Sequence, residues 1–308
     1  MSQTKNILNL IPRKEELSVI RSYWNLMKPE LTLLSVFTSV GSGFLAADLN
    51  LKVPVFILFA LALGTLLVGG GAGTLNQYFE AEFDGMMSRT ANRPIPSDKI
   101  KKKYALIFGL SITSIGWIIL FSLNLLTGFL AVLTWMIYVF LYTPLKRISP
   151  VSTIIGAIPG ALPVLIGWAS VDNKITLEGF ILFAILYYWQ APHFYSLSWM
   201  YRDDYEKAGY RLLSIVNKSG NRVSKHILVN LVILFVAGLL PAFVGKIKII
   251  SFVGAALISG YFLYTGILFE RNVRKENSVL YARKVFFMSL VYLPLFFLLL
   301  VIEKIFFL

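Results

Sequence analysis

Long apolar stretches recur along the whole of this 308-residue chain, separated by shorter polar segments. A helix of about 20 apolar residues crosses the ~30 Å hydrocarbon layer of a bilayer. Each stretch has about that length, so each predicts one membrane-spanning helix. Nine such windows are present, at residues 29–48, 53–76, 104–123, 125–143, 152–170, 176–199, 225–244, 247–268 and 284–302.

The overall composition supports this interpretation. Hydrophobic residues make up 57% of the chain and aromatic residues 15%, and the mean hydropathy is +0.71. Ordinary soluble domains contain about 45–50% apolar residues. Because the excess is what lipid-facing helices require, the chain is predicted to be a polytopic membrane protein.

The positions of the basic residues predict the orientation of the helices. Lys and Arg accumulate in short loops on the cytoplasmic side of a membrane, and 24 of the 29 basic residues fall in segments that share one side. The amino terminus is therefore predicted to be inside and the carboxyl terminus outside, in a bacterial cytoplasmic membrane. This asymmetry and attraction to anionic lipid explain the net charge of +13 without any nucleic-acid partner.

The amino-terminal segment has no features of a secretory signal, because Glu15 and Glu16 interrupt it and no continuous apolar core is present. Residues 1–28 are predicted to form a cytoplasmic amphipathic segment on the membrane surface, and residues 29–308 to form the transmembrane domain. The absence of cysteine excludes disulfides and thiol catalysis.

Polar residues at the end of the second window form a candidate metal site. Asn76, Glu80 and Asp84 recur at every fourth position, so a helix places them on one face at intervals of ~6 Å. Mg²⁺ is usually bound by one or two such carboxylates together with substrate phosphates. The alternative is that they mark where the helix meets water, which we expect for Glu82. Polar groups in membrane segments are costly and usually functional, so the metal site is preferred.

Basic residues follow this face directly. Arg89 and Arg93 come soon after Asp84, and guanidinium groups clamp phosphate oxygens in bidentate fashion. Lys146 lies four residues after Tyr142, at the inner end of the fourth window, and supplies a further positive charge. Together with the metal face, these residues predict a binding site for a metal diphosphate.

A second polar cluster lies in and after the sixth window. His193 lies within the window, and Asp203 and Asp204 follow at its cytoplasmic end. Carboxylates from the second and sixth helices that face one cavity can hold Mg²⁺ around a diphosphate and stabilise it as a leaving group. The fifth window contains Pro159 and Pro163 among glycines, which predicts a loosely wound helix lining the interior.

These residues resemble the motifs of a known family, the UbiA superfamily of intramembrane prenyltransferases, and within it the protohaem IX farnesyltransferases or haem O synthases. The resemblance covers nearly the whole chain. Two departures are visible: Tyr201 and Tyr205 occupy positions where quinone-type relatives carry acids, and Glu80 stands where many relatives carry aspartate. The matching residues are Asn76, Glu80, Asp84, Met87, Arg89, Thr90, Arg93 and Pro94 in the first motif, residues 142–146, residues 192–194, and Asp203, Asp204, Tyr205, Ala208 and Gly209 in the second.

The resemblance implies an all-α fold of nine transmembrane helices around a central cavity, with a cytoplasmic cap over the diphosphate site. It implies transfer of a farnesyl group from farnesyl diphosphate to a vinyl carbon of haem B, giving haem O and diphosphate with the help of Mg²⁺. A downstream haem A synthase is the partner that such a product implies. The implied metal ligands are Asn76, Glu80, Asp84, Asp203 and Asp204; the implied catalytic and substrate-binding residues add Arg89, Arg93, Tyr142, Lys146 and His193.

Three roles stay open for His193: a ligand of the haem iron, an acceptor for the proton of an attacking water, or a hydrogen-bonding residue within the bundle. His226, next to Lys225, is expected to be a surface residue. Two other functions also stay open for the chain. One is a membrane transporter, which would bring its polar residues to the bilayer midplane. The other is a prenyltransferase that acts on a quinone or chlorin precursor.

Overall fold

The computed structural model describes residues 14–47, 55–244 and 249–307, and every regular element within these ranges is a helix. The first half contains α2 Lys14–Leu26, α3 Pro29–Ala46, α4 Val55–Asp84, α5 Lys102–Leu123, α6 Leu125–Met136, the π-helical turn η1 Ile137–Tyr142, α7 Thr143–Leu145 and α8 Ser152–Asp172. The second half contains α9 Leu177–Met200, α10 Arg202–Lys207, α11 Leu213–Val216, α12 Asn221–Leu239, the 3₁₀ turn η2 Leu240–Ala242, α13 Ile249–Asn272 and α14 Ser278–Phe307.

Long helical rods occupy all nine predicted windows within the described residues. Seven of them are long and apolar enough to cross a membrane: α4, α5, the continuous rod from α6 to α7, α8, the rod from α12 to η2, α13 and α14. The other two, α3 and α9, do not meet the same measure. Both carry polar side chains along their length, such as Thr38 on α3 and Gln190 on α9. The all-α membrane bundle is thus confirmed, while the count of nine spans stays a prediction.

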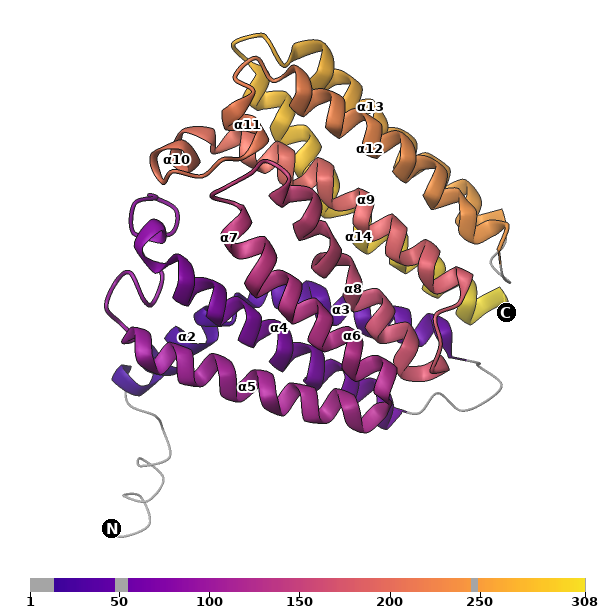
Figure 1. The fold of residues 1–308 in the computed structure, drawn as a ribbon. Helices are drawn as coiled ribbons and strands as arrows, with labels where there is room; N and C mark the ends of the chain where they lie inside the picture. The colour runs from indigo at the N-terminus through magenta and orange to yellow at the C-terminus, as the bar shows by residue number, and fades with distance from the viewer. Residues whose placement is uncertain (1–13, 48–54, 245–248, 308) are drawn as a thin grey trace, which may run out of the picture.

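The helices form one bundle in which α8 and α9 join the two halves of the chain. The helix α8 packs against α3, α6 and α9, and α9 packs in turn against α12 and α14. In Figure 1 the helices α12 and α13 lie side by side, and the short helices α10 and α11 lie at the end of the bundle that also holds the turn after α4. The predicted amphipathic segment is described from Lys14 onward and is helical there; its first 13 residues lie outside the described ranges.

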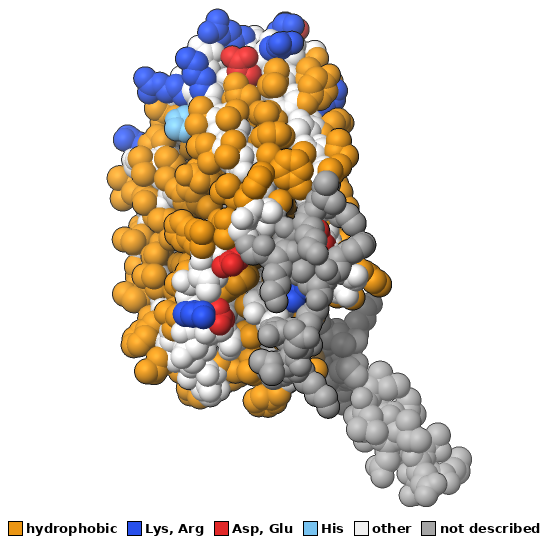
Figure 2. Space-filling model, turned by 90° about the vertical axis from the view of Figure 1, so that its right-hand side faces the viewer, with side chains coloured by type: hydrophobic (Ala, Val, Ile, Leu, Met, Phe, Trp, Pro, Cys, Tyr) orange, Lys and Arg blue, Asp and Glu red, His pale blue; other side chains and the backbone are white. Residues whose placement is uncertain are grey.

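The outer surface is apolar, as a bilayer requires. Large hydrophobic side chains point outward from several rods, among them Phe56 at 76% exposure and Ile118 at 70%. Figure 2 shows one face of the molecule on which hydrophobic side chains dominate, with Lys and Arg gathered at the top. A contiguous exposed apolar surface of this kind indicates contact with lipid.

The helix α8 lies in the interior, as predicted, because most of its side chains are buried. The expectation that Pro159 and Pro163 unwind it is wrong, since α8 is continuous from Ser152 to Asp172. Small residues permit a close crossing with α3. Ser42 Oγ donates to the Val164 carbonyl at 2.8 Å, and a Cβ at Gly167 would run into the backbone carbonyl of Ser39.

We expect Gly167→Ala to destabilise the bundle, because the new methyl group meets backbone that cannot move aside. Overpacking of this kind costs typically about 1–3 kcal/mol. The measurement is the thermal midpoint of the purified protein in detergent. Gly260→Ala on α13 is the matched control, since its Cβ meets only the Phe235 ring at 3.7 Å. Equal midpoints for the two variants would contradict the close crossing.

Candidate active site

The polar face of α4 is buried although it carries two acidic groups. Asn76 and Asp84 are 0% exposed and Glu80 is 4% exposed. Glu82, between the last two, has a side chain that is 77% exposed and lies 3.9 Å from Lys102, so it is solvated as expected. Burial of charge costs several kcal/mol per ion unless it is compensated, so the partners of Glu80 and Asp84 determine whether this face is stable.

Asn76 lies between two other segments of the chain. Lys28 Nζ donates to its side-chain oxygen, and its amide nitrogen donates to Thr143 Oγ1 at 2.9 Å. Lys28 precedes α3 and adopts the left-handed conformation, with φ 50° and ψ 63°. Such a conformation costs on the order of 1 kcal/mol in a residue other than glycine and is often found at functional sites.

The charge of Lys28 is weakened by its surroundings. Burial, together with the positive charge of Arg93, lowers the pKa of Lys28 to about 7, although Glu80 acts in the opposite direction. Its ammonium group is therefore only partly charged near neutral pH.

Glu80 is neutralised by Lys146, which follows α7. Lys146 Nζ lies 2.5 Å from Glu80 Oε1, and both side chains are largely buried. The ammonium group also lies over the rings of Tyr142 and Tyr210, at 4.9 and 5.6 Å from their centroids. Burial disfavours the charge of Lys146, but the Glu80 carboxylate and the hydrogen bond to it outweigh this effect and raise the pKa of Lys146.

Asp84 is neutralised by Arg93. One guanidinium nitrogen, Nη1, donates to both carboxylate oxygens at 2.7 Å. The intervening turn is held by Thr90, whose hydroxyl donates to the Asp84 carbonyl at 2.8 Å. Asp84 is the last residue of α4, so this pair lies at the end of the bundle where the connecting turns meet.

The turn after α4 is joined to the turn after α9. Arg89 donates to the Tyr205 hydroxyl at 3.1 Å, and Ser88 donates to Asp204 at 2.8 Å. Beneath these contacts, side chains from both turns form one small apolar cluster, with Met87 against Ala208, Tyr210 and Leu212. The two predicted motifs are thus brought together by direct contacts.

The two acids of the second motif occupy different environments. Asp204 receives the Ser88 hydrogen bond and so contacts the first motif. Asp203 has a side chain that is 82% exposed, and its partner is the neighbouring Arg202 at 3.5 Å. Within the described residues, no group of three or more His, Asp or Glu side chains is arranged to hold a metal ion. The metal roles of Asp203 and Asp204 stay predictions.

The α4 face itself fits a divalent cation by its chemistry. Its donor groups are an amide oxygen and two carboxylates, all of them hard oxygen ligands of the kind that Mg²⁺ prefers. Asn76, Glu80 and Asp84 are each engaged by a basic side chain, from Lys28, Lys146 and Arg93. Ammonium and guanidinium groups also bind phosphate oxygens. A metal diphosphate could therefore bind the oxygen ligands of α4 through its metal ion and the basic side chains through its phosphate oxygens.

His193 lies on α9 and contacts α14. Its Nδ1 lies 2.8 Å from Ser289 Oγ, and its ring packs between Trp189 and Phe286, with centroids 5.3 and 4.9 Å away. His193 contacts residues of α9 and α14, so the structure does not place it against the α4 face. Its role therefore stays a prediction.

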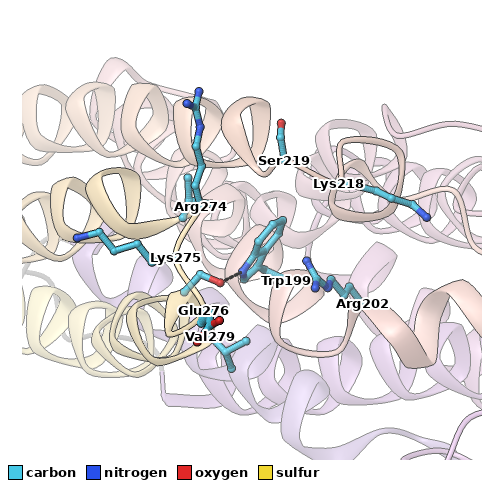
Figure 3. A pocket seen from close by; sticks show the side chains of 10 residues that line it. Trp199, Arg202, Lys218, Ser219, Arg274, Lys275, Glu276 and Val279 are labelled. Atoms are coloured by element: carbon cyan, nitrogen blue, oxygen red, sulfur yellow. Dashed lines mark hydrogen bonds between the residues drawn. The ribbon is translucent and has the colours of Figure 1, made fainter.

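A separate pocket of about 450 Å³ lies at the same end of the bundle (Figure 3). It is lined by the end of α9, the start of α10, the turn between α11 and α12, and the loop that follows α13. Trp199 lies on its wall, and its indole nitrogen donates to Ser278 at 3.3 Å. Arg202 stacks over the Trp199 ring, with its guanidinium carbon 5.0 Å from the ring centroid. Arg202, the ion-pair partner of Asp203, thus lines this pocket and not the α4 face.

Sequence reasoning missed three polar partners of the site. Lys28 lies in the basic amino-terminal segment, and its place before Pro29 signals a helix start, but nothing in the sequence indicates its contact with Asn76. Thr143 was not assigned a role, although it adjoins Tyr142. Ser289 lies in an apolar window, where a single serine gives no signal without knowledge of the facing helix.

Comparison with known proteins identifies the family of this chain. The model of the UbiA prenyltransferase family matches residues 34–291. The chain therefore belongs to the UbiA prenyltransferase family. With its apolar helices, this membership makes it an integral-membrane prenyltransferase.

Two proteins similar to this chain are both named protoheme IX farnesyltransferase. The protoheme IX farnesyltransferase of Solibacter usitatus is 36% identical over 294 residues, which cover 92% of this chain and 99% of that protein. The enzyme of the same name from Opitutus terrae is 38% identical over 287 residues, covering 92% and 95% of the two chains.

Two solved structures share the fold. A digeranylgeranylglyceryl phosphate synthase superposes with a TM-score of 0.77 at 18% identity, covering 93% of this chain and 99% of that one. A UbiA homolog from Archaeoglobus fulgidus, bound to GPP and Mg²⁺, superposes with a TM-score of 0.66 at 15% identity, covering 91% and 99%. At these identities the likeness shows the fold alone.

We expect Lys146→Met to destabilise the protein, because it leaves the Glu80 carboxylate buried without its partner. Breaking a buried ion pair from one side costs about 3–5 kcal/mol. The double variant Glu80→Gln, Lys146→Met removes both charges and should recover most of the loss. Thermal unfolding of the three purified proteins measures the effect; a double variant no more stable than Lys146→Met would refute the pairing.

Proposed function

We propose that this protein transfers the farnesyl group of farnesyl diphosphate to a vinyl carbon of haem B, giving haem O and diphosphate. The observation that carries the proposal is the buried polar face of α4, where Asn76, Glu80 and Asp84 are met by basic side chains from other segments. The names of the similar proteins support the choice of both substrates.

The basic side chains account for binding of the diphosphate. Arg89, Arg93 and Lys146 lie around the end of α4 and present guanidinium and ammonium donors. Guanidinium groups match the geometry of phosphate. Their hydrogen bonds to the phosphate oxygens become stronger as negative charge grows on the departing diphosphate. Lys28 adds a fourth donor at the deeper end of the face, where it contacts Asn76.

Mg²⁺ is the metal that this face fits, and Asn76, Glu80 and Asp84 are the residues that would hold it. When bound, the ion neutralises diphosphate charge and so improves the leaving group. The binding of Mg²⁺ together with GPP to a UbiA homolog of the same fold supports this assignment. Asp204, which is tied to the first motif by Ser88, is the candidate from the second motif.

The reaction itself needs no covalent enzyme intermediate. The allylic carbon–oxygen bond breaks and its electron pair leaves with the diphosphate. Aromatic rings such as Tyr138 and Tyr142, whose centroids lie 5.4 Å apart, can stabilise the resulting allylic cation and shield it from water. The vinyl π electrons then form the new carbon–carbon bond, and the cation left beside the porphyrin captures water and loses a proton to give the hydroxyl group.

The position of the acidic groups favours an enzyme over a carrier. Asp84 is the last residue of α4, and Asp204 lies in the first turn of α10, directly after α9. A transporter would hold its polar groups near the bilayer midplane. A prenyltransferase of a quinone or chlorin precursor is the nearer alternative, and product analysis separates it from a haem enzyme.

Asp84→Ala should abolish prenyl transfer, because it removes a carboxylate from the proposed metal face and leaves Arg93 without its partner. We expect a loss on the order of 100-fold or more, measured as farnesylated haem formed by membranes supplied with haem B, farnesyl diphosphate and Mg²⁺. Glu82→Ala is the matched control, since Glu82 lies on the same helix but is exposed. Full activity of Asp84→Ala, or prenylation of a quinone precursor in place of haem B, would contradict the proposal.

The proposed orientation has the amino terminus in the cytoplasm and the carboxyl terminus outside, in a bacterial cytoplasmic membrane. We expect alkaline phosphatase fused after Leu308 to be active, because that enzyme works only outside, and the same enzyme fused after Lys218 to be inactive. The opposite pattern would reverse the topology. In this orientation the diphosphate site opens to the cytoplasm, and the product remains in the membrane for a downstream haem A synthase.

A further inference from the structure

The side chain of His193 is held from three directions. The Trp189 ring stacks on it with an interplanar angle of 22°, and the Phe286 ring lies 4.9 Å away on α14. Ser289 Oγ lies 2.8 Å from Nδ1. No hydrogen bond to Nε2 occurs among the residues that the structure describes, so no side chain there engages the lone pair of this ring nitrogen.

The hydrogen bonds of Ser289 determine which ring nitrogen carries the proton. A serine hydroxyl has one hydrogen to donate, and Ser289 Oγ lies 2.5 Å from the Phe286 carbonyl in the preceding turn. A carbonyl oxygen can only accept, so the serine hydrogen must point to Phe286. Ser289 Oγ is then the acceptor in its contact with His193, and Nδ1 must be the donor.

We propose that Ser289 is a positioning residue that fixes His193 as the Nδ1–H tautomer, so that the lone pair of Nε2 binds the iron of haem B. This inference rests on the proposed function for the identity of the haem substrate. Histidine ligands of metals commonly donate their second ring N–H to a fixed acceptor, which sets the tautomer and the orientation of the ring. Ser289 is that acceptor here.

The backbone of the two helices is held independently of the serine side chain. The Trp189 indole nitrogen donates to the Ser289 carbonyl at 2.8 Å. Ser289→Ala keeps this contact and the shape of the site, since it removes only one oxygen. The variant therefore tests the hydroxyl group itself.

The experiment is a titration of purified full-length protein with haem B, followed by the Soret absorbance, without farnesyl diphosphate. We expect Ser289→Ala to weaken iron ligation about tenfold and to raise the KM for haem B by a similar factor, with kcat less affected. Ser289→Thr keeps a hydroxyl that can bond the preceding turn and should retain the wild-type spectrum. Ser259→Ala, which removes a comparable buried contact with Tyr292, is the control for packing.

His193→Asn separates ligation from structure. Its amide nitrogen can still donate to Ser289, but it has no group in the place of Nε2, so we expect it to lose the His-dependent Soret band as fully as His193→Ala. The proposal is overturned if His193→Asn keeps that band, if Ser289→Ala binds haem B as the wild type does, or if the wild-type spectrum does not depend on His193. Failure of the proposed function appears separately, as wild-type protein that ligates haem B through His193 but forms no farnesylated product.

Discussion

The structure depends on compensating two acidic side chains that are buried in an apolar bundle. Glu80 and Asp84 are almost fully buried on α4, and each is compensated by a cation that arrives from elsewhere in the chain, Lys146 after α7 and Arg93 from the turn that follows α4. Because an uncompensated buried charge costs several kcal/mol, these pairs tie the connecting turns to the helix. The same cations are the proposed ligands of the diphosphate, so under this proposal the interactions that stabilise the substrate-free protein also prepare the site for its ligand.

The end of the bundle where these pairs lie is held together by both halves of the chain. Ser88 and Arg89 contact Asp204 and Tyr205, and Met87 packs in one apolar cluster with Tyr210. The backbone N–H of Arg211, two residues after the second motif, donates to the Lys146 carbonyl at 3.0 Å, which links this segment to the residue that neutralises Glu80. The two motifs therefore act as one structural unit, although long stretches of sequence separate them.

The sequence alone predicted the helical membrane bundle and the family, because apolar periodicity and local motifs are short-range signals. It also predicted which polar residues share a face of α4, since helical spacing fixes that. It did not predict which cation meets which acid: Lys146 was expected to contact substrate, and its pairing with Glu80 depends on how α7 packs on α4. The exposure of Asp203 depends likewise on the direction in which α10 leaves α9. Lys28 and Ser289 were missed because their partners lie on other helices.

The π-helical turn η1 shows how the register of a helix can control a site. It lies between α6 and α7 and ends at Tyr142, directly before Thr143, which bonds Asn76. A π turn contains one residue more than the α-helical path, and each residue of an α-helix turns the chain by about 100°. Loss of a single residue from this turn would rotate every later side chain of the rod, so that neither Thr143 nor Lys146 faced α4. Homologous chains that differ in length at this point would thus have the same residues after the turn but would present different side chains to α4.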